Sequence, residues 1–327
     1  MTLILSRDDV RSLISMPTVI EQVEKAHAEF NAGRVDQPTR VTVKLAGSPN
    51  AILPMTATIP AIGAAGLKLL SIFPTNSERS LPVLNAAVML VDPETGRCDA
   101  VLEGGVLTAY RTAAASAVAT KLLAREDVAT LGLIGAGIEA RTHLDAMLCV
   151  RPDVRRVLVW SRTRQSAERF AEDVDDRPVD VTVVDSPEDA TSGVDILCTL
   201  TPSKEPIVRG RWFSPGLHVN AVGTHWIGSR EIDTEAVVRS RVVVDSRDAN
   251  QAECGDLMIP VAEGAITTEH FHDELGEVIN GDRPGRGTAE EITMYQSVGL
   301  AIQDVATATL LIRDARNQGV GTDVPLW

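Results

Sequence analysis

Residues 131–140 read Leu-Gly-Leu-Ile-Gly-Ala-Gly-Ile-Glu-Ala, and this stretch decides the fold of the chain. The apolar run 131–134 predicts a buried strand. The pattern Gly-x-Gly-x-x-Ala that follows predicts a tight turn at Gly135 and then a helix. Gly137 would let the backbone approach a pyrophosphate, and Ala140 would let the helix lie close to the sheet. The free N–H groups and the positive end of the helix dipole would then face the anion, so the stretch predicts a dinucleotide-binding turn.

Beyond this turn, predicted strands alternate with predicted helices, and we find no internal repeat. Such alternation is typical of a parallel, doubly wound sheet. We therefore expect an α/β protein with a nucleotide domain of the Rossmann type. The expected helices cover 139–149 and 165–174, and the expected strands cover 157–160, 181–184, 195–198, 217–221 and 241–244.

Before this turn, apolar and polar residues alternate in short segments that turn residues separate. This alternation predicts half-buried strands in a mostly antiparallel sheet, and so a second, mixed α+β domain. Helical spacing predicts a helix over 16–30, and the Ala-rich run 108–124 predicts another. The chain also ends in a predicted apolar helix over 298–313. The expected strands are 41–45, 51–53, 66–70 and 83–91.

The 327 residues carry a formal net charge of −14, which limits the partners of the chain. The phosphates of nucleic acids and the surfaces of anionic membranes attract clustered cations, so neither is an expected partner. The N-terminus becomes charged at once and lacks the apolar core of a signal peptide. Four scattered cysteines form no Cys-x-x-Cys pattern, which indicates reduced thiols and no metal site. We expect a cytoplasmic protein.

The residues after the second strand of the nucleotide domain bear on the choice of cofactor. An NAD site places Asp or Glu there to bind the ribose 2′-hydroxyl. This chain instead has Ser161, Arg162, Thr163 and Arg164. Guanidinium groups bind phosphate through paired hydrogen bonds. The pattern favours NADP(H), with NAD(H) as the alternative, and the two arginines could also be solvated charges at a helix start.

Three cations stand in the weakly charged first part of the chain. Arg40 precedes a predicted strand, Lys68 lies inside one, and Arg111 lies near the start of the Ala-rich helix. A cation among apolar residues costs free energy unless it is paired. One explanation is an ion pair with a carboxylate of the core. The other is an anionic substrate, whose carboxylate would satisfy all three cations at once.

Several segments resemble the ornithine cyclodeaminase/mu-crystallin family, in the expected order along nearly the whole chain. The most specific is Thr-Ala-Tyr-Arg-Thr-Ala-Ala-Ala-Ser at 108–116. The others are Gly-Leu-Lys-Leu-Leu at 66–70, Leu-Pro-Val-Leu-Asn-Ala-Ala-Val-Met-Leu-Val-Asp at 81–92, the Gly-rich turn at 135–140, His-Val-Asn-Ala-Val-Gly at 218–223 and Ser-Val-Gly-Leu-Ala at 297–301.

The resemblance implies a subunit of two domains, and a homodimer joined through the substrate domains. The substrate-binding and dimerisation domain would comprise 1–117 plus 303–327. The NAD(P)-binding Rossmann domain would comprise 118–302.

The resemblance also implies roles for individual residues. Arg40, Lys68 and Arg111 would hold the substrate carboxylate, and Lys68 would lie near the reacting carbon. Thr112 would touch the cofactor phosphates, and 297–299 would lie near the nicotinamide. With the turn residues and the residues after the second strand, the expected cofactor contacts are Thr112, Gly135, Ala136, Gly137, Ile138, Glu139, Ser161, Arg162, Thr163, Val222, Ser297 and Gly299.

The chain departs from the family pattern at one position. Cyclodeaminases carry an Asp two residues after the Gly of Asn-Ala-Val-Gly, where it handles the substrate's amino group; here the position holds His225. Imidazole would bind an ammonium poorly, but it could act as a general acid or base, or hold a second anionic group. It could also be a loop residue that faces away. The departure weakens the case for cyclodeamination.

Together these patterns predict an NAD(P)-dependent oxidoreductase that acts on CH–NH2 or C=N groups. Hydride would pass to the imine of a small 2-oxo acid, and Lys68 or His225 would assist proton transfer at nitrogen. A cyclic ketimine, the imine of pyruvate, or a dicarboxylic imine such as iminosuccinate would each fit. Two alternatives stay open: an ammonia lyase of the ornithine cyclodeaminase type with catalytic NAD, and a non-enzymatic, mu-crystallin-like binding protein.

Overall fold

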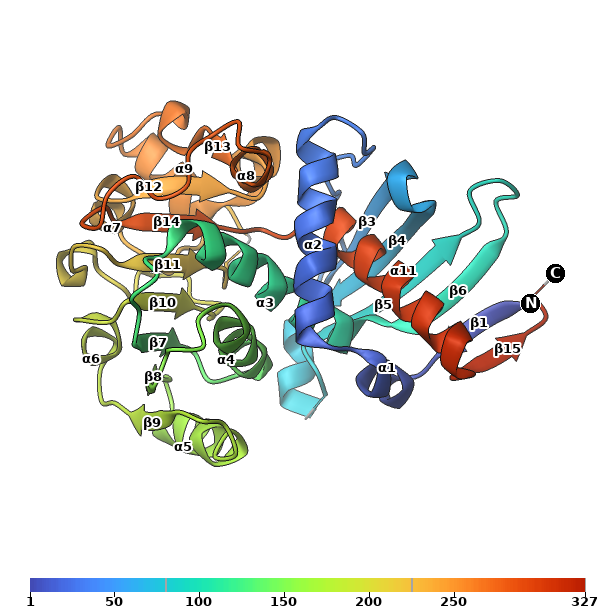
Figure 1. The fold of residues 1–327 in the computed structure, drawn as a ribbon, viewed down its shortest axis with the longest axis horizontal. Helices are drawn as coiled ribbons and strands as arrows, with labels where there is room; N and C mark the ends of the chain where they lie inside the picture. Colours follow the sequence, from blue (N-terminus) through green and yellow to red (C-terminus); the bar gives the residue numbers. More distant parts are fainter. Residues whose placement is uncertain (80, 225, 327) are drawn as a thin grey trace. The chain divides into compact units, whose positions relative to one another are not determined.

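The computed structural model describes residues 1–79, 81–224 and 226–326, apart from the side chains of Ser77 and Glu78. The helices and strands confirm the expected α/β class, and Figure 1 shows their arrangement.

The chain divides into two compact units. Unit 1 comprises Met1–Thr112 and Leu300–Trp327, and unit 2 comprises Ala113–Gly299. The sequence placed the boundaries at 117/118 and 302/303. The functions expected of the two parts stay predictions.

Unit 2 is built on an eight-stranded sheet in which every neighbouring pair is parallel. Its central strands are buried along their whole length, as expected where helices cover both faces of a sheet. In sheet order the strands are β13 (Asp273–Glu274), β12 (Arg241–Val244), β14 (Thr293–Gln296), β11 (His218–Ala221), β10 (Ile196–Thr199), β7 (Thr130–Ile134), β8 (Arg156–Trp160) and β9 (Asp180–Val183).

The helices of unit 2 connect these strands. They are α4 (Ile138–Val150), α5 (Arg164–Asp173), α6 (Pro187–Thr191), α7 (Thr234–Val238), α8 (Arg247–Glu253), α9 (Gly255–Ala262) and α10 (Leu275–Asn280). The chain builds outward from β7 through β8 to β9, and then returns to place β10 on the other side of β7. Ligands of doubly wound sheets bind at such a reversal, beyond the carboxyl ends of the strands.

Unit 1 is built on a seven-stranded sheet, which is antiparallel except where β1 pairs with β6. In sheet order the strands are β15 (Thr322–Val324), β1 (Thr2–Leu5), β6 (Cys98–Glu103), β5 (Leu84–Val91), β4 (Ala64–Ile72), β3 (Ala51–Ile59) and β2 (Val43–Lys44). The helices are α1 (Arg7–Leu13), α2 (Met16–Asn31) and α11 (Ala301–Gln318), and α3 (Gly104–Leu123) begins in this unit.

Helix α11 is the centre of the packing in unit 1. It lies against β3, β4, β5 and α2, and most of its side chains are buried. The helix that the sequence predicted over 298–313 begins later than expected, at Ala301. The reason is that residues 297–299 donate hydrogen bonds to Asp245 instead of entering the helix, and Gly299 has a φ of 82°.

The described part of the chain has no membrane-spanning helix and no metal-binding cluster. No helix there is long and apolar enough to cross a membrane. No three His, Cys, Asp or Glu side chains there gather in a way that could hold a metal ion. All four cysteines are free thiols, of which Cys149 is exposed and Cys198 and Cys254 are buried.

Candidate active site

Two of the three predicted cations of unit 1 meet on one carboxylate. Strand β4 alternates its side chains so that Lys68, like Leu70, faces the buried side of the sheet. There its Nζ donates to Oδ1 of Asp304 on α11 over 2.8 Å. Arg111 on α3 donates from Nε to the same oxygen over 2.9 Å. Lys68 and Asp304 are fully buried, so this ion pair is shielded from water.

Arg40 belongs to the same neighbourhood. Its guanidinium lies 3.9 Å from the sulfur of Met55, and Met55 is the residue of β3 that pairs directly with Lys68. Its positive charge is also one of the causes that lower the pKa of Lys68. The structure therefore brings together the three cations that the sequence singled out.

The sequence left two explanations open for these three cations. The first, an ion pair with a carboxylate of the core, holds for Lys68 and Arg111. Asp304 was not among the residues that the sequence singled out. It stands in the first turn of α11, where the helix dipole alone explains a carboxylate. The sequence signal that could have found it is the one that found Lys68: a charge inside an apolar run. An internal carboxylate does not exclude a substrate carboxylate, because two guanidiniums and an ammonium exceed one negative charge.

Burial sets the protonation of this cluster. Desolvation and the nearby Arg111 lower the pKa of Lys68 to about 7, against the opposing effect of Asp304. Gln303 accepts from Nη1 of Arg111 over 2.7 Å, and its amide nitrogen lies 2.9 Å from Nε2 of His27. Burial and Arg111 lower the pKa of His27 to about 4, so this imidazole is neutral at pH 7.

The glycine-rich turn of unit 2 has the geometry that a dinucleotide needs. Gly135 has a φ of 113°, and a Cβ there would lie 3.0 Å from the carbonyl oxygen of Leu200. A Cβ at Gly137 would instead project into open space, at the N-terminus of α4 where a pyrophosphate would approach. Ala140 is fully buried, as expected of a residue that lets the helix lie close to the sheet. The residues of the turn therefore fit a dinucleotide cofactor.

Other predicted cofactor contacts lie next to this turn in the sequence or in unit 1. Ala136 is buried, Ile138 is about half exposed, and Glu139 stands in the first turn of α4. Thr112, in unit 1, donates its hydroxyl to the carbonyl oxygen of Thr108 one helical turn earlier.

The residues after β8 differ in whether their side chains already have hydrogen-bond or ion-pair partners. The Thr163 hydroxyl lies 2.6 Å from the Ser166 hydroxyl. Arg164 is paired with Glu168 and Asp185, so its charge is already balanced. Arg162 is exposed and has no hydrogen bond or ion pair with any described residue, which leaves its guanidinium available to a ligand.

Two buried carboxylates that the sequence did not single out organise the carboxyl edge of the sheet. Asp245, which follows β12, accepts through Oδ2 from the Ser297 hydroxyl and from the N–H groups of Val298 and Gly299. It thereby fixes the loop predicted to lie near the nicotinamide. The sequence feature that could have identified Asp245 is a carboxylate directly after an apolar strand.

The second carboxylate, Glu231, ties β10 to β11. It accepts from the hydroxyl of Thr199, from the N–H and hydroxyl of Thr201, and from the N–H of Gly223, which follows Val222. Burial and the neighbouring Asp256 raise the pKa of Glu231. Thr199 and Thr201 lie 30 or more residues before Glu231, so no local pattern indicates the role. The predicted catalytic residue His225 stands two positions after Gly223 and lies outside the described residues.

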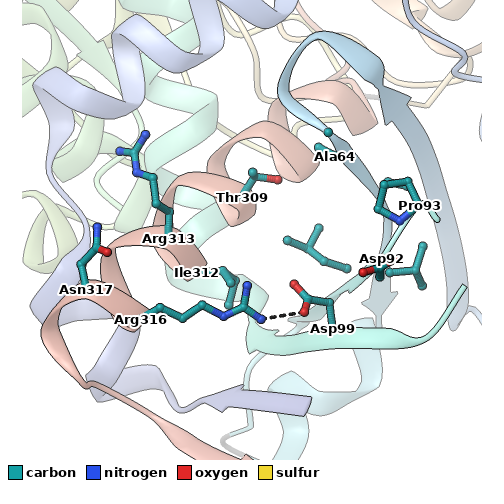
Figure 2. Close-up of a pocket in the computed structure, with 13 residues that line it drawn as sticks. Ala64, Asp92, Pro93, Asp99, Thr309, Ile312, Arg313, Arg316 and Asn317 are labelled. Carbon is teal, nitrogen blue, oxygen red and sulfur yellow. Dashed lines mark hydrogen bonds and ion pairs between the residues drawn. The ribbon is translucent and has the colours of Figure 1, made fainter. Parts of the chain in front are cut away.

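A surface pocket of about 390 Å³ lies elsewhere in unit 1, between the C-terminal half of α11 and the turn that joins β5 to β6. Figure 2 shows it with the ion pair of Arg316 and Asp99, which spans 2.6 Å. The described residues that line it include none of the predicted site residues.

Comparisons with known proteins show the family of the chain. A family model, "Ornithine cyclodeaminase/mu-crystallin family", matches residues 1–319. The chain belongs to this family.

Two curated family members cover nearly the whole chain. The Delta(1)-pyrroline-2-carboxylate reductase of Bacillus cereus is 36% identical over 98% of this chain and 99% of its own. The ketimine reductase mu-crystallin of Mus musculus is 37% identical over 94% of this chain and 95% of its own.

Two solved structures of the family have the same fold. One is the Delta(1)-pyrroline-2-carboxylate reductase of Thermococcus litoralis in complex with NADH and L-proline. It is 41% identical and matches with a TM-score of 0.96 over 99% of this chain and all of its own. The other is an archaeal alanine dehydrogenase dimer with bound NAD, 35% identical, with a TM-score of 0.94 over all of this chain and 99% of its own.

Proposed function

We propose that the protein is an NAD(P)H-dependent reductase that converts the imine of a small 2-oxo acid into the corresponding amino acid. The observation that carries the proposal is the cluster of Arg40, Lys68 and Arg111 in a chain that also holds a complete dinucleotide turn. Named reductases of the family, 36% to 41% identical over nearly full length, support it.

The residues of the cluster would divide the work. Arg40 and Arg111 bind the substrate carboxylate, and their fixed positions orient the α-carbon. A nicotinamide cofactor held at the glycine-rich turn would supply the hydride for that carbon. Lys68 donates the proton to the imine nitrogen, since an ammonium with a pKa of about 7 is a suitable acid near neutral pH. The product is an amine, and in the reverse direction Lys68 takes the proton back.

A panel of imines tests the reaction. The panel consists of Δ1-pyrroline-2-carboxylate, Δ1-piperideine-2-carboxylate, pyruvate with ammonia, and oxaloacetate with ammonia, each with NADPH and with NADH. We expect the absorbance of the reduced nicotinamide to fall with at least one cyclic or small monocarboxylic imine. No reaction with any member and either cofactor would overturn the proposal and leave the binding-protein alternative. Proline from ornithine with catalytic NAD would instead identify a cyclodeaminase, which His225 disfavours.

We also propose that NADP(H) is preferred, because Arg162 is exposed and has no partner among the described residues, at a place where an NAD site would carry a carboxylate. Arg162→Ala should raise the KM for NADPH by about tenfold or more, since a bidentate phosphate contact is lost, and leave the KM for NADH nearly unchanged. Arg169→Ala, an exposed arginine of α5, is the control. An equal loss for both cofactors would contradict the assignment.

A homodimer through unit 1 completes the proposal. The face of the seven-stranded sheet opposite Lys68 presents Val43, Ile52, Pro54, Leu69 and Ala87 on four adjacent strands. Val43 and Leu69 are 45% and 40% exposed, which is unusual for apolar side chains on the strands of a sheet. A second copy of the chain would cover this face, and the structure of the alanine dehydrogenase relative is described as a dimer.

A further inference from the structure

One carboxylate oxygen stands between two cations at the proposed site. Oδ1 of Asp304 accepts from Nζ of Lys68 and from Nε of Arg111, and all three side chains are buried. Because one atom accepts both bonds, neither cation can turn away without breaking a buried, charge-assisted contact. The neighbouring Gln303 holds a second nitrogen of Arg111, so two consecutive residues of α11 orient that guanidinium.

The charges that act on Lys68 come from α3, from α11 and from the segment before β2, whereas its neighbours on β3 and β5 are the uncharged Met55 and Val88. Arg111 on α3 and Arg40 before β2 oppose its positive charge, and Asp304 on α11 is the one carboxylate among the described groups that favours it. His27 on α2 is neutral at pH 7 and touches the cluster through Gln303. Without Asp304, the ammonium would face two guanidiniums and an apolar interior, and both disfavour the protonated form.

We propose that Asp304 is the positioning residue of the lysine: it fixes the ammonium of Lys68 against Arg111 and keeps it protonated for transfer to the substrate nitrogen. The part that concerns the substrate rests on the proposed function. The part that concerns Lys68 does not, because the contact exists within this chain alone.

The titration of Lys68 can be measured without any substrate. The chain has five lysines, so a sample labelled with 13C at the lysine ε-carbons gives few signals, and Lys68→Met identifies the one of interest. In Asp304→Asn, the midpoint of Lys68 should fall by at least about one pH unit, as expected for removal of an opposite charge in direct contact. The control is Asp314→Asn, which removes a carboxylate of the same helix that pairs with Arg313 instead. An unchanged midpoint in Asp304→Asn, or an equal change in the control, would overturn the proposal.

A second variant covers the case in which Asp304→Asn does not fold. Asp304→Glu keeps the charge but moves the oxygens by one methylene, so the midpoint of Lys68 should stay near the wild-type value while kcat falls by about tenfold or more. A Glu variant with wild-type kcat would show that the placement of the cations does not matter. In Asp304→Asn the pH profile of kcat should move with the NMR midpoint.

The two proposals fail in different ways. If the imine panel gives no turnover but the Lys68 midpoint depends on Asp304, the reductase proposal fails and the role of Asp304 toward Lys68 stands. If turnover is observed and the midpoint does not depend on Asp304, the reverse holds. The affinity for NAD(P)H should stay near wild type in both Asp304 variants, because Asp304 is not among the expected cofactor contacts.

Discussion

Lys68 combines full burial with a pKa lowered to about 7, and this makes the proposed reaction sensitive to pH in the physiological range. Imine reduction needs the ammonium as acid. As the pH rises through about 7, Lys68 loses its proton, and kcat/KM for the imine should fall by about tenfold per pH unit above the pKa. Amine oxidation needs the neutral base, so its kcat/KM should rise with pH up to about 7 and level off above it. The pH profiles of kcat/KM for imine reduction and for amine oxidation check this prediction. Profiles that change with pH in the same direction would contradict it.

Replacement of Lys68 gives the matching test of its role. Lys68→Met keeps a flexible apolar chain in the buried position and removes the proton donor. We expect kcat to fall by about 10²- to 10⁴-fold, the usual contribution of general acid catalysis, with little change in NAD(P)H affinity. Stopped-flow turnover and a fluorescence titration with NAD(P)H measure the two quantities. A Met variant with more than a tenth of the wild-type kcat would assign the proton to another group.

At this scale the sequence identified the cations but not their partner. Lys68 and Arg111 were conspicuous because charge is costly in apolar surroundings. Asp304 was not, because it lies 236 residues from Lys68 and an acidic residue in the first turn of a helix already has an explanation. Long-range pairing of this kind depends on the packing of α11 against β4, which no local pattern specifies.

At the scale of elements, the two glycines of the glycine-rich turn have different roles: one is needed for the backbone conformation and the other for cofactor binding. Gly135 serves the fold: Gly135→Ala combines a positive φ with a contact to the Leu200 carbonyl, so we expect a loss of stability of about 1–3 kcal/mol together with weaker cofactor binding. Gly137 serves the ligand: Gly137→Ala meets no protein atom within 4 Å and should change stability by less than about 1 kcal/mol.

The measurement that checks this contrast pairs urea unfolding with a fluorescence titration of NAD(P)H. For Gly137→Ala we expect at least about a tenfold weaker affinity, since the Cβ would occupy the space of the pyrophosphate. Equal affinity in Gly137→Ala and wild type would show that the pyrophosphate does not approach there. Equal stability losses in the two variants would contradict the separation of roles.

The elements also show where sequence patterns stop being informative. The predicted helix over 298–313 began three residues too early because Ser297–Gly299 looks apolar and small, while the structure uses its N–H groups on Asp245. The alternation of strands and helices after β7 was largely predictable, because strands such as β7 and β10 are apolar runs. Strand β14 was not predicted, because its buried sequence Thr-Met-Tyr-Gln is not an apolar run. Its position between β11 and β12 was not predictable either, because sheet order depends on contacts between distant segments.

For the whole molecule, the exposed apolar face of unit 1 predicts a specific change of oligomeric state. Leu69→Glu would place a carboxylate in the interface of the proposed dimer, and an unpaired buried charge there costs several kcal/mol. We expect wild type to have the mass of a dimer in light scattering, and the variant that of a monomer. Val238→Glu, an equally exposed apolar residue on α7, is the control and should stay dimeric. A monomeric wild type, or a dimeric Leu69→Glu, would contradict the interface.

Unit 1 is assembled from both ends of the chain, and this order has a consequence for biosynthesis. Asp304 leaves the ribosome 236 residues after Lys68, behind the whole of unit 2. Through that interval the nascent sheet lacks both its central helix and the counter-ion of its buried ammonium. Unit 1 therefore cannot complete its packing until α11 has been synthesised, although its first strands are among the earliest parts of the chain to be made.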